Sequence, residues 1–126
     1  MIRIIFAIVL LLHGLIHLLG FVVPWRLATL EEMPYKTTVL AGALDVGEAG
    51  IRAVGLLWLL AAIGFMAAAG ALFTLRPWWA AVTLGTTLFS LTVCILGWPE
   101  ARFGALINLA ILAFLFVAGR MAWLGQ

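Results

Sequence analysis

Charge and cysteine are scarce in this sequence. Charged residues occupy 10% of the 126 positions, against about a quarter in a soluble domain, while apolar residues occupy 67%. Together with a mean hydropathy of +1.27, this balance excludes an ordinary water-soluble domain. The basic residues behind the net charge of +2 are scattered singly, so no basic patch indicates nucleic-acid binding. The only cysteine, Cys94, excludes an internal disulfide bond and a multi-cysteine metal site.

Long apolar runs dominate what remains, and each can span a bilayer, which takes about 20 helical residues. We expect helices at about residues 3–23, 50–75, 77–98 and 101–122. The first run is longer than the apolar core of a secretory signal peptide and lacks a small-residue cleavage motif after it, so we expect it to be retained. The sequence therefore predicts an all-α protein, an antiparallel bundle of four transmembrane helices in a single domain over residues 1–126.

Tryptophans and arginines indicate where these helices end. An indole ring prefers the headgroup level, and five of the six tryptophans fall at predicted helix ends: Trp25, Trp78, Trp79, Trp98 and Trp123. One side of the bundle would carry Arg3, Arg76 and Arg120 on short segments without acidic residues. The other side would carry four basic residues, Arg26, Lys36, Arg52 and Arg102, diluted by all five acidic ones. Basic residues mark the cytoplasmic side, and their density, though not their number, favours the first side. We therefore expect a multi-pass protein of the cell inner membrane with both termini in the cytoplasm.

The loop at residues 24–49 is the only substantial connection. Its second half, within VLAGALDVGEAGIRAV (residues 39–54), is compatible with a short helix. Asp45, Glu48 and Arg52 would then share one face, with Glu48 four residues before Arg52 in the favourable order for an ion pair. This segment is either a solvated first turn of the second helix or a lid that holds carboxylates over the mouth of the bundle.

Polar side chains inside the spans are the informative residues, because such groups are costly in a membrane. His13 and His17 are spaced to share one face of the first helix. Threading the helices antiparallel at about 1.5 Å per residue places His17, Trp58 and Asn108 at one height, together with Ser90 and Thr92, and His13 one turn deeper. We therefore expect a polar pocket that opens toward the loop side. The plainer interpretation is a set of interhelical hydrogen bonds, worth about 0.6 kcal/mol each.

Several chemistries could use these residues. A metal site would need two further ligands from Glu48, Asp45, Glu100 or Asn108, and a bis-histidine haem would need a second subunit, because one helical face cannot supply both axial ligands. Acid/base catalysis on a lipophilic substrate would pair a histidine with Glu100 or Glu48. Binding without chemistry would let His and Asn donate to a ligand carbonyl while Trp58 packs on its ring. The residues do not separate the last two alternatives.

Four stretches resemble a group of small, uncharacterised four-helix bacterial membrane proteins. They are LLHGLIHLLGF (11–21), GLLWLLAA (55–62), RPWWA (76–80) and WPEARFGALINLAIL (98–112). In general design the chain is also similar to DoxX-like membrane proteins, some of which are associated with quinone-linked redox complexes. The resemblance implies that the histidine pair, Trp58, Glu100 with Arg102, and Asn108 belong to the group's pattern, but it implies no reaction.

We therefore predict an intramembrane pocket for a lipophilic small molecule, a quinone or a lipid, with or without proton transfer. His13, His17 and Glu100 are the candidate catalytic residues. The candidate ligand-binding residues are Trp58, Asn108, Arg102 and Glu48, with Glu100 and Arg102 gating the pocket. The alternative is a structural or assembly subunit of a larger membrane complex or a homo-oligomer, in contact with membrane lipids. The sequence identifies no cofactor.

Overall fold

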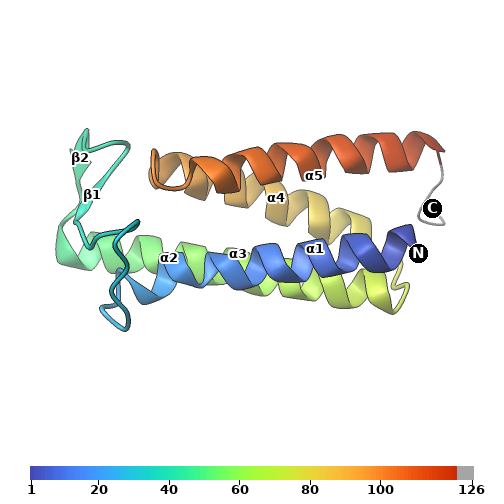
Figure 1. Ribbon diagram of the computed structural model, residues 1–126, viewed down its shortest axis with the longest axis horizontal. Helices are drawn as coiled ribbons and strands as arrows, with labels where there is room; N and C mark the ends of the chain where they lie inside the picture. Colours follow the sequence, from blue (N-terminus) through green and yellow to red (C-terminus); the bar gives the residue numbers. More distant parts are fainter. Residues whose placement is uncertain (122–126) are drawn as a thin grey trace.

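The computed structural model describes residues 1–121 and is an all-α, antiparallel helical bundle (Figure 1). The helices are α1 (Ile2–His17), α2 (Leu19–Val22), α3 (Gly47–Phe73), α4 (Trp79–Leu96) and α5 (Arg102–Met121). Since α1 and α2 together form one span, the described residues hold four helical spans long and apolar enough to cross a membrane. The chain is therefore a multi-pass membrane protein, as its composition predicted.

The loop after α2 contains no helix before Gly47, so the short helix that its side chains allowed does not form there. From Gly47 on, the segment is the exposed first turn of α3, which was one of the two interpretations. It forms a small antiparallel hairpin of β1 (Thr38–Val39) and β2 (Leu44–Asp45). Leu40, Ala41 and Gly42 have positive φ angles, which a helix does not allow. The amides of Leu40 and Ala41 donate to the carbonyls of Leu96 and Trp98, each at 2.9 Å. The hairpin thus satisfies carbonyls at the end of α4 that have no partner within their own helix.

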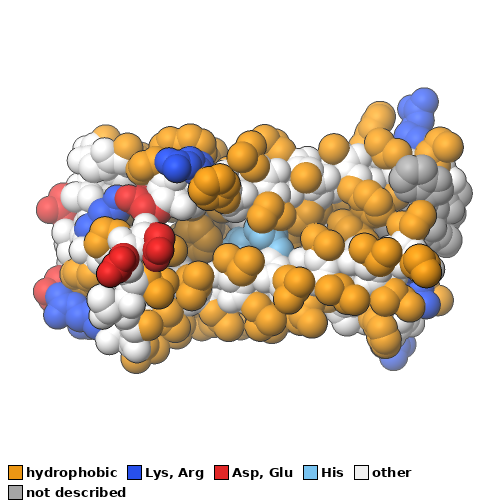
Figure 2. Space-filling model, in the orientation of Figure 1, with side chains coloured by type: hydrophobic (Ala, Val, Ile, Leu, Met, Phe, Trp, Pro, Cys, Tyr) orange, Lys and Arg blue, Asp and Glu red, His pale blue; other side chains and the backbone are white. Residues whose placement is uncertain are grey.

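The spans pack in a chain of neighbours, α1 on α3, α3 on α4, and α4 on α5. Gly14 lets α1 approach α3 closely, because a Cβ at this position would lie 2.9 Å from Cβ of Phe65. Arg3 fixes the opposite end of this contact, where its guanidinium donates to the carbonyl of Phe73 at 2.6 Å. Apolar side chains cover the middle of the molecule, and the acidic side chains visible in Figure 2 gather at the hairpin end.

The tryptophans lie at helix ends in part as predicted. Trp25, Trp78 and Trp98 are exposed near the ends of their spans. Trp79 also begins a helix, but it is buried in the core with Phe6 and Leu72. Position 123 and the predicted helix end at residue 122 lie outside the described residues.

Candidate functional site

A closed ring of hydrogen bonds joins α1, α4 and α5 in the interior of the bundle. His13 Nε2 lies 2.8 Å from Asn108 Oδ1, and Asn108 Nδ2 donates to Ser90 Oγ at 2.9 Å. Ser90 Oγ lies 2.5 Å from His17 Nε2, and His17 Nδ1 lies 2.7 Å from the carbonyl oxygen of His13. All four side chains are buried. The predicted meeting of His17, Ser90 and Asn108 at one height is therefore confirmed.

The hydrogens of this ring can be assigned from its one backbone acceptor. The His13 carbonyl only accepts, so His17 Nδ1 carries hydrogen and the Nε2 of a neutral His17 accepts from the Ser90 hydroxyl. Ser90 Oγ then accepts from the Asn108 amide, whose oxygen accepts from His13 Nε2. A neutral imidazole carries one N–H, and in His13 this hydrogen is on Nε2, so His13 Nδ1 is an unprotonated acceptor. This buried atom has no hydrogen-bond partner among the described residues.

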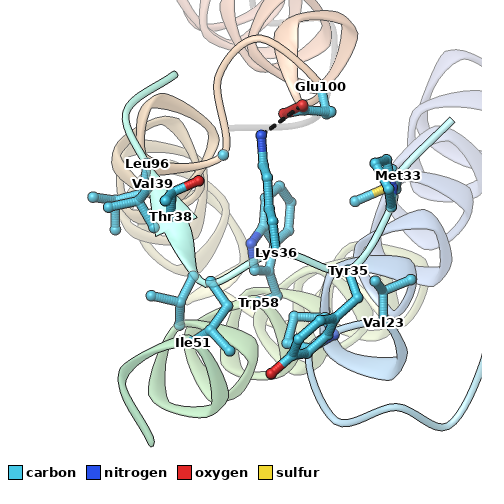
Figure 3. Close-up of a pocket in the computed structure, with 15 residues that line it drawn as sticks. Val23, Met33, Tyr35, Lys36, Thr38, Val39, Ile51, Trp58, Leu96 and Glu100 are labelled. Carbon is cyan, nitrogen blue, oxygen red and sulfur yellow. Dashed lines mark hydrogen bonds and ion pairs between the residues drawn. The ribbon is translucent and has the colours of Figure 1, made fainter. Parts of the chain in front are cut away.

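Trp58 separates this ring from the loop. Its indole lies 5.2 Å from the His17 ring, centre to centre, and it also lines a cavity of about 70 Å³ beneath the hairpin (Figure 3). Gly20 makes room for the indole, since a Cβ there would overlap it. The histidines do not line this loop-side cavity. A single polar pocket running from the histidines to the loop, as the sequence suggested, is therefore not what forms.

Two residues that line the loop-side cavity form an ion pair. Lys36 Nζ lies 2.7 Å from Glu100 Oε1 (Figure 3). Partial burial acts to raise the pKa of Glu100, but the hydrogen bond and charge of Lys36, with a backbone hydrogen bond, outweigh it and hold this pKa below its ordinary value of 4.5. Glu100 is therefore a carboxylate paired with a lysine, a partner that no sequence pattern indicated.

The other predicted site residues lie outside this cavity and outside the ring of hydrogen bonds. Glu48 forms an exposed ion pair with Arg26 at 3.1 Å, so the expected pairing with Arg52 is wrong. Asp45 lies on β2 rather than on the face of a helix. Arg102 is exposed, with its guanidinium 5.1 Å from the ring centre of Phe103, and does not line the cavity that it was expected to gate.

Thr92, which was expected in the polar layer, is exposed on α4. Its hydroxyl donates to the Leu88 carbonyl at 3.3 Å, within its own helix. The ring of hydrogen bonds therefore takes Ser90 from this turn of α4 and leaves Thr92 outside.

A second cavity, which the sequence did not indicate, runs between α1 and α5. This α1/α5 groove has a volume of about 410 Å³ and an apolar lining that includes Phe6 and Val9 of α1 and Ala110 and Ile111 of α5. On α5 the lining reaches Ile107, the residue before Asn108, whereas on α1 it stops at Val9, four residues before His13. The groove therefore ends beside Asn108 and about one turn short of His13. Histidine atoms are visible in the seam between these helices in Figure 2.

The groove gave no sequence signal because lipid-facing and groove-facing positions are both apolar. Val9, which lines the groove, is 40% exposed, and its apolar side chain is of the same kind as those that face lipid. The separation of α1 from α5 depends on how all four spans pack, so it cannot be predicted from the sequence of any one span.

Within residues 1–121, no three His, Cys, Asp or Glu side chains form a group that could hold a metal ion. Comparison of the chain with protein-family models, with curated proteins and with solved structures found no match. The function is therefore inferred from the residues of the site.

Proposed function

We propose that this protein binds a lipophilic small molecule, a quinone or a lipid, in the α1/α5 groove beside the His13–Asn108 hydrogen bond. One observation carries the proposal: an apolar groove at the surface of the bundle ends about one turn from an uncharged cluster of buried polar side chains. Small-molecule sites commonly combine an apolar lining with a few polar groups that fix orientation.

The size and position of the groove support this function. Its volume of about 410 Å³ falls within the roughly 300–1,000 Å³ of typical ligand pockets. Ile5 and Val9 line it and are half exposed on the outer surface of the bundle, so a ligand dissolved in the bilayer has direct access. The buried polar groups are costly in this position, which favours a functional role.

The arrangement supports binding more strongly than acid/base catalysis. Glu100, the expected proton partner, is engaged by Lys36 in the loop-side cavity. The closed ring of hydrogen bonds passes through the Asn108 amide and the backbone carbonyl of His13, and neither group releases and regains a proton readily. A proton taken up by His13 therefore has no relay through these residues.

We also propose that the protein lies in a bacterial inner membrane with both termini in the cytoplasm. Arg3 and Arg76 lie at one end of the spans in short segments without acidic neighbours. The acidic residues of the chain fall in the loop segments and at the first turn of α3, at the hairpin end. Four basic residues also lie at the hairpin end, spread over longer segments with these acidic residues: Arg26, Lys36, Arg52 and Arg102. The proposed orientation therefore rests on the density of basic residues in the short segments at the other end, not on their number.

A structural or assembly subunit is the second candidate, and it too has an observation in its favour. The ring of hydrogen bonds closes on itself through His13 and His17 without any ligand. Such a ring would fix the register of α1 against α4 and α5 even if nothing bound in the groove.

Native mass spectrometry of gently extracted protein separates the two candidates. Ala110→Phe fills the groove, while Ala113→Phe changes another exposed alanine of α5 that does not line it. We expect a bound lipophile on the wild type and on Ala113→Phe, and none on Ala110→Phe. Empty wild-type protein, or equal occupancy of both variants, would overturn ligand binding in the groove in favour of the structural candidate.

A further inference from the structure

The α1/α5 groove itself is lined by apolar side chains, and the first polar groups beyond its end are His13 and Asn108. The hydrogen bonds that these groups already make narrow the class of ligand. We infer that the ligand is a hydrogen-bond donor, a phenolic ring of the quinol type with an apolar tail, which donates its hydroxyl to His13 Nδ1. This inference rests on the proposed function. It goes beyond it by choosing the hydroxyl-bearing, reduced form of such a ligand over a quinone carbonyl.

The donors next to the groove are already engaged. The two hydrogens of the Asn108 amide point to Ser90 Oγ at 2.9 Å and to Cys94 Sγ at 3.6 Å. The Ser90 hydroxyl donates to His17, and both N–H groups of the histidine pair are used within the ring. A quinone carbonyl would need one of these donors and would have to break the ring.

Two other buried hydroxyl groups of α4 also already donate hydrogen bonds. Thr83 and Thr87 donate to backbone carbonyls of their own helix at 2.7 and 2.6 Å. Only an acceptor is left over, since His13 Nδ1 is buried without a partner among residues 1–121. An unsatisfied buried acceptor is unfavourable, and a ligand hydroxyl would satisfy it.

The surroundings of His13 favour a ring over an aliphatic alcohol. The rings of His17 and Phe65 lie 4.5 and 4.7 Å from the His13 ring, centre to centre, so the acceptor is set among aromatic groups. The groove continues from Val9 to Ile2 along α1, a length of about 10 Å at 1.5 Å per residue. That length accommodates an alkyl tail alongside the helix.

Matched ligands test the donor directly. We would measure binding of decylhydroquinone, kept reduced without oxygen, of decylbenzoquinone, and of the dimethyl ether of decylhydroquinone to the protein in lipid nanodiscs, with empty nanodiscs as the partition control. We expect the hydroquinone to bind roughly tenfold more tightly than the other two, the value of one buried hydrogen bond. Its binding should be lost in Ala110→Phe and kept in Ala113→Phe.

Nitrogen NMR of the two histidines gives a second readout. The His13 Nδ1 resonance should move when the hydroquinone binds, while the His17 resonances stay close to their free positions. Equal binding of all three compounds, blocked by Ala110→Phe, would overturn the donor inference and leave groove binding in place. A long-chain alcohol that binds as tightly as the hydroquinone would overturn the choice of a phenolic ring. Binding of no compound, or binding that Ala110→Phe does not block, would overturn the proposed function as well.

Discussion

Replacing Asn108 by leucine tests whether the ring of hydrogen bonds holds the bundle together. Leucine keeps the branch at Cγ but removes the bonds to His13 and Ser90. Hydrogen bonds between membrane helices average about 0.6 kcal/mol each. The larger effect comes from the His13 Nε2–H, which is left unpaired in the interior at a cost of about 1–3 kcal/mol. We therefore expect Asn108→Leu to lower the free energy of unfolding by about 2–3 kcal/mol.

Reversible unfolding in mixed detergent micelles, followed by circular dichroism, measures this change. Thr92→Val is the control, because Thr92 is exposed and its hydroxyl bonds within its own helix. We expect it to change the free energy of unfolding by less than about 0.5 kcal/mol. The double variant His13→Leu with Asn108→Leu should be less destabilised than the sum of the single variants by about 1 kcal/mol, since no unpaired donor remains. A loss in Asn108→Leu no larger than in Thr92→Val would refute the reasoning.

Three further predictions concern fit, protonation and pH. Gly20→Ala should destabilise the protein by about 1–3 kcal/mol because its Cβ overlaps Trp58. Gly70→Ala places its Cβ in open space and should be neutral or stabilising. The denaturant midpoints of unfolding measure both effects, and equal midpoints for the two variants would contradict the packing argument. Nitrogen NMR should find the histidine pair in opposite neutral tautomers, and two identical tautomers would contradict the assigned ring. Because Lys36 helps to hold the pKa of Glu100 below 4.5, the contribution of this pair to stability is present above that pH and is lost as the pH falls through the lower value of the folded protein. Glu100→Gln should therefore weaken the pH dependence of stability in that range, and an unchanged profile would show that the pair contributes nothing.

The four spans could be predicted from the sequence because each depends on a local property. An uninterrupted apolar run of sufficient length requires a helix in a bilayer, whatever its neighbours. Similarly, the common height of His17, Ser90 and Asn108 follows from helix length and antiparallel order, since the rise per residue is fixed. The hairpin was missed because residues 39–46 have helix-compatible side chains. Their backbone instead pairs with carbonyls at the end of α4, a contact that no local pattern records.

The sequence by itself determined that this is a four-helix membrane protein with a polar layer of histidine, serine and asparagine inside it, because hydrophobicity and helical periodicity act along the chain. Only the tertiary structure decided which of these groups bond to one another, that Glu100 pairs with Lys36, and that the larger cavity lies between α1 and α5. These features depend on the distances between separate helices, which packing sets. Apolar surfaces that meet a neighbouring helix, a lipid or a ligand are alike in sequence, and they differ only once the helices are assembled.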